Sequence, residues 1–200
     1  YSKPAIKSLA NILFENKLNE KNKSLDNDKI FKIENEIIIK DLNFKYETKN
    51  PNIFENLNLK IKSGSRVGIM GATGSGKTTL VDLLLGLLKP LKGDILSDEK
   101  SIYKDVVSWR SIIGYVTQAP YLMDDTVLNN IVFGAIHNEI DHEKVDKIIK
   151  ITQLSKYIES SQNGLQTIIG ERGVQLSGGQ IQRIAIARAL YRDLKILILD

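Results

Sequence analysis

The sequence predicts an α/β protein built on a parallel sheet, and three observations point to this class. A glycine-rich loop, Gly71–Thr78, lies between an apolar run and a helical segment. A second apolar run, Leu194–Leu199, ends at a carboxylate, Asp200. Hydrophobic residues make up 42% of the 200 residues, which is enough for one domain of this kind. Open α/β sheets bind ligands at the carboxyl ends of their strands, so we expect the site there.

The glycine-rich loop has the spacing G-x-x-x-x-G-K-[ST] of a phosphate-binding loop. Glycine lets the backbone adopt positive φ, so consecutive N–H groups can point into one concavity. Lys77 would place a cation between the β- and γ-phosphates of a nucleotide, and the Thr78 hydroxyl would ligate Mg²⁺. The expected nucleotide contacts are Gly71, Ala72, Thr73, Gly74, Ser75, Gly76, Lys77, Thr78 and Thr79.

The residues around this loop predict a strand followed by a helix. Arg66–Met70 is typical of a buried strand and Thr79–Leu85 of a helix, with Pro90 beyond its end. The N-terminus of that helix then faces the phosphates with its partial positive charge. The later run Leu194–Leu199 lacks polar alternation, which predicts a buried parallel strand that presents Asp200 as a Walker B acid for Mg²⁺.

A second motif, Leu176–Gln180, reads Leu-Ser-Gly-Gly-Gln and precedes another helical segment. Ser177 can cap that helix, and the amides of Gly178 and Gly179 lie at its positive end. The sequence therefore predicts a second anion-binding helix end, 100 residues after Lys77.

With both motifs in this order, the chain resembles the ATP-binding cassette (ABC) ATPases over residues 37–200. The resemblance implies a P-loop NTPase (RecA-like) core with an antiparallel β subdomain, and an inserted helical subdomain over residues 119–187. Residues 33–200 would form an ATP-binding domain that is incomplete after the Walker B strand. Residues 1–32 would be a linker from an upstream transmembrane domain, helical over 1–15 and hydrated over 16–32.

The resemblance also implies roles for single residues. Tyr46 stands where the family stacks an aromatic ring on adenine. Gln118 stands where the family has a glutamine that touches Mg²⁺ and the attacking water. Lys77, Gln118 and Asp200 would be the catalytic residues, while Thr78, Gln118 and Asp200 would arrange Mg²⁺ beside ATP. Trp109, by contrast, is expected to be a packing residue.

The expected partners follow from the same resemblance. In the family, two identical or different cassettes pack head to tail, and the signature motif of one closes over the γ-phosphate held by the other. The residues that would do so here are Ser177, Gly178, Gly179 and Gln180. In exporters the segment that corresponds to Thr167–Gly173 contacts a transmembrane domain, which is expected to share this polypeptide. Two residues depart from the pattern: the family often has Glu where Ile168 stands and a basic residue at Ile181.

Charge and composition bear on the partners. Residues 1–32 hold seven lysines against four acids, while the remainder is nearly balanced at 21 basic and 20 acidic residues. Because residues 33–200 are nearly neutral, they are not expected to form the clustered basic surface that binds nucleic acid, so no nucleic acid is expected as a partner. No run reaches the ~18–20 apolar residues that span a bilayer. The basic N-terminal segment suits the cytoplasmic face of the cell (inner) membrane, and it equally suits a solvated linker.

Two other functions fit parts of the same pattern. A nucleotide-gated regulatory module would bind ATP with little turnover, and it would lack a glutamate directly after Asp200. A soluble ABC ATPase acting on ribosomes would carry two cassettes per chain. One acting on DNA would need a long coiled-coil insertion, for which the 100 residues between Lys77 and Ser177 leave no room. For an exporter, lipid, lipid-linked sugar, peptide and drug all fit as cargo.

We expect residues 1–200 by themselves to fold poorly and to hydrolyse little ATP. In the family the catalytic glutamate, the switch histidine and a strand between the Walker A and Walker B strands all follow the position of Asp200. Thermal unfolding and ATP turnover of residues 1–200 test this expectation, with a longer version of the chain as the control. Cooperative unfolding and comparable turnover in the shorter chain would contradict it.

Overall fold

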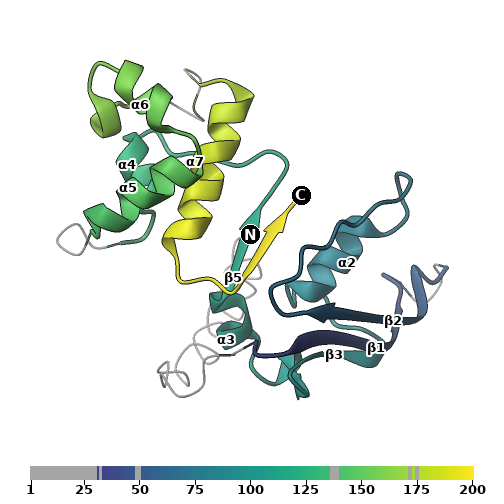
Figure 1. Cartoon of the computed structure of the whole chain (residues 1–200). Helices are drawn as coiled ribbons and strands as arrows, with labels where there is room; N and C mark the ends of the chain where they lie inside the picture. The colour runs from purple at the N-terminus through teal and green to yellow at the C-terminus, as the bar shows by residue number, and fades with distance from the viewer. Residues whose placement is uncertain (1–30, 32, 48–50, 136–139, 171–172, 174–175) are drawn as a thin grey trace, which may run out of the picture. The chain divides into compact units, whose positions relative to one another are not determined.

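The computed structural model describes residues 31, 33–47, 51–135, 140–170, 173 and 176–200. Apart from Phe31, the helix and linker expected over residues 1–32 lie outside this part of the chain, as do Glu171 and Arg172. The strands are β1 (Glu36–Phe44), β2 (Phe54–Lys62), β3 (Lys92–Ser97), β4 (Lys100–Ser101), β5 (Ile113–Val116) and β6 (Ile196–Leu199) (Figure 1). The helices are α2 (Lys77–Leu84), η2 (Ile102–Lys104), α3 (Val106–Ser111), α4 (Val127–Ile131), α5 (His142–Ile151), α6 (Ser155–Ser160), η4 (Gly164–Gln166) and α7 (Gly178–Tyr191).

Strands β1 to β4 form an antiparallel sheet in the order β2-β1-β3-β4. The sequence predicts separate strands near residues 36–40 and 42–47, whereas the structure joins most of these residues in the single strand β1. The buried side chains of β1 are at odd positions in its first half, Ile37 and Ile39, and at even positions in its second half, Leu42 and Phe44. A register irregularity beside Asp41, whose φ is +48°, accounts for the change, because one extra residue moves the following side chains to the opposite face.

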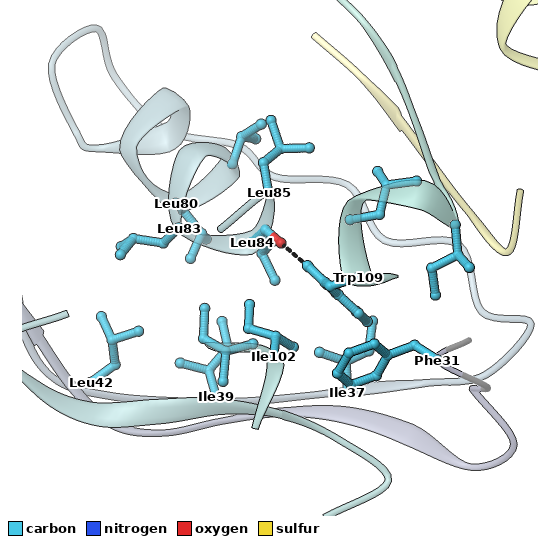
Figure 2. Close-up of a cluster of buried hydrophobic side chains, with 14 of the residues drawn as sticks. Phe31, Ile37, Ile39, Leu42, Leu80, Leu83, Leu84, Leu85, Ile102 and Trp109 are labelled. Atoms are coloured by element: carbon cyan, nitrogen blue, oxygen red, sulfur yellow. Dashed lines mark hydrogen bonds between the residues drawn. The ribbon is translucent and has the colours of Figure 1, made fainter. Parts of the chain in front are cut away.

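Helix α2 packs on this sheet and forms the larger hydrophobic core (Figure 2). The prediction of a helix at Thr79–Leu85 is confirmed, with the observed helix beginning two residues earlier at Lys77. Its buried residues include Leu80, Leu83 and Leu84. Full burial of one leucine stabilises the fold by about 1.5–3 kcal/mol, so these side chains anchor α2 strongly.

The prediction that Arg66–Met70 is a buried strand is wrong for this structure. The segment pairs with no strand among the described residues, and the exposed fractions of Val67 and Met70 are 51% and 94%. An apolar run needs a paired neighbour on each side to become a buried parallel strand, because its backbone N–H and C=O groups must otherwise face water. The described residues supply no such neighbour.

Strands β5 and β6 form a separate parallel pair in which Ile113 lies opposite Ile196 and Val116 opposite Leu199. The parallel direction of the run that ends at Asp200 is as predicted. Its complete burial is not, because Leu197 and Leu199 are exposed by 37% and 58%. With β5 as the partner on one side alone, alternate side chains of β6 face outward.

The helices after β5 have a core of their own. Residues from α4, α5 and α7 meet there, and its fully buried members include Leu122, Val127, Ile131, Leu154 and Ile184. The sequence predicts mostly helix over 121–165, and α4, α5, α6 and η4 fall within that range. Within the described residues, no helix is both long enough and apolar enough to cross a bilayer.

The turn between β3 and β4 fixes the start of β1. Asp98 and Glu99 both have positive φ, as a two-residue hairpin turn requires. The Asp98 carboxylate accepts hydrogen bonds from the backbone N–H groups of Glu34, Asn35 and Glu36. The donors at Glu36 and Glu34 favour the ionised carboxylate and hold the pKa of Asp98 below its usual value.

Replacement of this carboxylate should reduce stability in a pH-dependent way. Because folding lowers the pKa of Asp98, its contribution is present above the unfolded pKa near 3.8 and is lost as the pH falls through the folded pKa. We expect Asp98→Asn to lower Tm at pH 7 by roughly 2–4 °C, the shift that about 1 kcal/mol produces in a domain of this size. Thermal unfolding followed by circular dichroism measures it. A Tm difference that does not shrink as the pH approaches 3 would contradict the assignment.

Candidate nucleotide site

The loop at residues 71–76 leads directly into α2. Gly74 and Gly76 have φ values of +82° and +91°, which residues with a Cβ rarely adopt. Gly76 is the N-cap residue of α2 and provides no side-chain cap. The first N–H groups of α2 therefore point toward the loop and suit an anion such as a phosphate.

Lys77 lies at the first position of α2 and folds back over the loop. Its ammonium group donates to the carbonyl oxygens of Gly71 at 2.9 Å and Ala72 at 2.8 Å. The side chain therefore crosses the concavity that the loop encloses. A phosphate oxygen in that concavity could replace these carbonyls as the acceptor, and it would add a charge-assisted bond.

Tyr46 is placed beside the beginning of α2. Its hydroxyl group shares a hydrogen bond with the Thr79 hydroxyl at 3.1 Å, and its ring meets Phe44 edge to face at 5.2 Å. More than half of Tyr46, 56%, is exposed to solvent. The structure thus brings this predicted base-stacking residue to the phosphate-loop helix and leaves part of its ring accessible.

Lys77 and Asp200 line the same cavity of about 440 Å³. Its apolar walls come from the segment before the loop and from β6, including Val67, Ile69 and Ile198. Asp200 lies at the end of β6, where its N–H donates to the carbonyl of Val116. The loop lysine and the acid after β6 therefore line one cavity.

Tyr115 is a site residue that the sequence did not indicate. Its hydroxyl donates to the Asp200 carboxylate at 3.3 Å. Burial, and secondarily the charge of Asp200, raise the pKa of Tyr115, so the phenol stays a donor at neutral pH. The two residues are 85 positions apart, and only the pairing of β5 with β6 reveals their contact.

Gln118 lies beyond the end of β5 and is exposed. Its side chain makes no hydrogen bond to the 71–78 loop within the described residues. Those residues also contain no group of three or more His, Cys, Asp or Glu side chains that would hold a metal by themselves. The hydroxyl of Thr78 and the carboxylate of Asp200 nonetheless suit Mg²⁺, which keeps several waters and takes few protein ligands when phosphate oxygens supply the rest.

The second motif begins α7 as predicted. The Ser177 hydroxyl accepts from the backbone N–H of Gln180 at 3.3 Å, and the Gln180 side chain accepts from the backbone N–H of Ser177 at 2.7 Å. This reciprocal capping box fixes the start of the helix. Gly178 and Gly179 are exposed, and a Cβ added at either would meet no atom within 4 Å. The positive end of α7 is therefore open to an anion.

Asn130 and Arg188 hold α7 to the segment that follows Gln118. The Arg188 guanidinium donates to the backbone carbonyls of Tyr121 and Asn130 and to the Asn130 side-chain oxygen, each at 2.8 Å. Asn130 is fully buried and also bonds both backbone groups of Met123. Partial burial lowers the pKa of Arg188. An Asn inside a helical apolar pattern was the available sequence signal, but its partners are 7 and 58 residues away.

The glycine loop, the lysine at the start of α2 and the acid at the end of β6 define a P-loop nucleotide-binding domain. The family model described as "ABC transporter" matches residues 54–200. The chain belongs to the ABC transporter family.

Similar proteins agree with this assignment. The chain is 42% identical over 177 residues to ABC transporter B family member 15 of Arabidopsis thaliana, covering 88% of this chain and 14% of the relative. It is 37% identical over 190 residues to the ABC multidrug transporter atrD of Emericella nidulans, and the match covers 94% of this chain and 14% of that transporter. Among solved structures it resembles a bacterial Atm1-family ABC exporter with ATP bound, with a TM-score of 0.77 and 33% identity over 86% of this chain and 30% of that one. The chain therefore spans less than a third of each of these proteins.

The positive φ at Gly76 and the space around it can be tested separately. An added Cβ at Gly76 would lie 2.8 Å from Cγ2 of Ile53 and 3.1 Å from Cζ of Phe54, whereas one at Gly74 would meet nothing within 4 Å. Both positions have positive φ, so Ala at either costs about 1–2 kcal/mol of backbone strain. We expect Gly76→Ala to lower Tm clearly more than Gly74→Ala in thermal unfolding. Equal shifts in the two variants would show that Ile53 and Phe54 do not constrain the loop.

Proposed function

We propose that this chain is the nucleotide-binding domain of an exporter-type ABC transporter and that it binds and hydrolyses ATP to power export across a membrane. The observation that carries the proposal is the phosphate loop, where Lys77 crosses the concavity in front of the N-terminus of α2. The family assignment and the names of the relatives support the same activity. The enzyme would be an ABC-type ATPase in the full-length protein.

In this proposal each part of the site acts on one part of the nucleotide. Tyr46 stacks on adenine with its exposed ring, and the 71–78 loop surrounds the phosphates. Lys77 exchanges its two carbonyl acceptors for β- and γ-phosphate oxygens. Thr78, Gln118 and Asp200 would hold Mg²⁺ and orient water, while the hydrogen bond from Tyr115 would keep the Asp200 carboxylate in place. Bound Mg²⁺ would neutralise charge on the phosphates. Catalysis then rests on positioning and charge neutralisation, as in other phosphoryl transfers.

A second cassette, identical or different, would complete the site. Its open helix end, formed by Ser177, Gly178, Gly179 and Gln180, would face the γ-phosphate held by Lys77 of the first chain. The capping box supports this role because it fixes the direction of the N–H groups before any ligand arrives. ATP would then join two cassettes, and hydrolysis would release them.

The transmembrane partner would dock on the segments at Gln118–Asp125 and Ile168–Gly173. The ends of these segments lie side by side: the Ile169 N–H donates to the Asp125 carbonyl, and Thr126 pairs with Ile168. Tyr121 and Ile168 are exposed by 64% and 60%, so they offer apolar surface to a membrane-domain helix. This arrangement fits a domain at the cytoplasmic face of the membrane, with the transmembrane part in the same polypeptide.

The loop lysine provides the direct test. In a longer version of the chain, we expect MgATP binding, measured by isothermal titration calorimetry, to weaken at least about tenfold in Lys77→Ala, because the cation between the phosphates is lost. Lys89→Ala, at an exposed lysine after α2, should bind within about twofold of the original chain, since only a screened surface charge changes. Equal binding by all three proteins, or no binding by any, would refute the proposal.

Dimer formation is tested separately from binding. Ser177→Arg should retain MgATP binding by its own loop, yet lose the ATP-dependent dimer in analytical ultracentrifugation. The measurement uses a longer version of the chain with glutamine at the position directly after Asp200, where the family has the catalytic glutamate, so that hydrolysis is slow. If that version remains monomeric with ATP even when Ser177 is intact, the head-to-tail arrangement is wrong.

A further inference from the structure

The carbonyl groups at the C-terminus of α2 accept hydrogen bonds from two sources: backbone N–H groups just after the helix and side chains of a later segment. Gly86, with φ of +67°, follows the C-cap residue Leu85. Its N–H bonds the Leu83 carbonyl, and the Leu87 N–H bonds the Asp82 carbonyl, which is the Schellman arrangement. The carbonyls of Leu84, Leu85 and Gly86 are left for other donors.

Two neighbouring side chains on α3 supply those donors. The indole N–H of Trp109 donates to the Leu84 carbonyl at 2.7 Å (Figure 2). The Arg110 guanidinium donates to the carbonyls of Leu85 at 3.1 Å and Gly86 at 2.6 Å. A cation at the C-terminus of a helix also interacts favourably with the helix dipole. The far end of the phosphate-loop helix is therefore held by α3, which leads directly into β5 and Gln118.

Trp109 also contacts the residue that joins the cassette to the preceding chain. It is fully buried, and Phe31 meets its ring edge to face at 5.4 Å with an interplanar angle of 77° (Figure 2). Phe31 is 3% exposed, and the Lys100 ammonium lies 4.1 Å from the centroid of its ring. The contacts thus run from Phe31 to Trp109 and on to the Leu84 carbonyl.

Helix α2 is short enough to act as one rigid body. It runs from Lys77 to Leu84, a length of about 12 Å at 1.5 Å per residue. Because the loop before it is exposed, the position of Lys77 depends on how α2 is held at its other end. The hydrogen bond to the Leu84 carbonyl is directional, so it restricts the orientation of the helix end in addition to the packing of the leucines.

We propose that Trp109 is a positioning residue for ATP binding, which holds α2 through the Leu84 carbonyl, and that Phe31 links the chain preceding the cassette to that helix through the indole. The proposal rests on the proposed ATP-binding function. A movement of Phe31 would then alter the affinity for ATP, and bound ATP would alter the surroundings of the indole. A tryptophan that only fills space in the core would have neither effect.

The single tryptophan of the 200 residues gives a direct readout. We expect MgATP to change the emission of Trp109 in a longer version of the chain that carries no other tryptophan, and not in Lys77→Ala of that version at the same concentration. Calorimetry on the same samples reports binding independently. Binding without any change in emission overturns the link between the nucleotide and Trp109. No binding at all refutes the ATP-binding function, and with it this inference.

Substitutions distinguish a positioning role of Trp109 from a role in core packing alone. Trp109→Phe keeps an aromatic ring for Phe31 but removes the N–H donor to Leu84. We expect its Kd for MgATP to rise between about two- and fivefold, the upper value applying if the whole net free energy of one hydrogen bond is coupled to binding, at a temperature at least 10 °C below its Tm. The matched control is Tyr191→Phe, which removes the hydroxyl bonded to the Asp141 N–H in the helical part, away from α2. Its Kd should stay within about twofold even where its Tm falls comparably.

Phe31→Leu tests the other end of the link and leaves Trp109 in place. We expect it to shift the emission of Trp109 without nucleotide and to raise the Kd for MgATP by about two- to threefold. It also decides the matter if Trp109→Phe fails to fold. Kd values within about twofold of the original for Trp109→Phe, or an unchanged Kd and emission for Phe31→Leu, overturn the inference.

Discussion

Burial of one face of α2 against the antiparallel sheet is the interaction on which the nucleotide site depends. Residues of the loop before α2 are exposed and make few contacts of their own, so the loop takes its place from the helix. Leu80, Leu83 and Leu84 fasten that helix to the core built on β1 and β3. The site is thus an exposed backbone motif carried by a packed helix, and the hydrophobic effect supplies most of the stability of that support.

The two ends of α2 favour opposite charges: an anion at the N-terminus, and cations or hydrogen-bond donors at the C-terminus. At the N-terminus, glycines with positive φ leave N–H groups open to an anion, and Lys77 adds a cation. At the C-terminus, carbonyl groups need donors, which Trp109 and Arg110 provide. The same helix dipole favours both arrangements. One end can therefore respond to a ligand while the other is tied to α3 and β5.

The open helix end at Ser177 rests on a different core, that of α4, α5 and α7. Its capping box was predictable because both partners lie within four consecutive residues. The Arg188–Asn130 network beneath it was not, since its hydrogen bonds join residues up to 67 positions apart. Likewise, the two strands predicted on either side of Asp41 form one strand with a register irregularity at that residue. No residue pattern near Asp41 predicts that the buried side chains change from odd to even positions there.

The sequence by itself determined the local chemistry: the phosphate loop, the helix after it, the cap at Ser177 and the acid that ends β6. These features depend on residues a few positions apart, whose types alone restrict φ and place donors. Tertiary structure alone decided which long-range partners meet, including Tyr115 with Asp200 and Phe31 with Trp109. It also left Arg66–Met70 unpaired among the described residues, against its apolar composition. Strand pairing and side-chain contacts of this kind depend on neighbours distant in sequence, which no local pattern specifies.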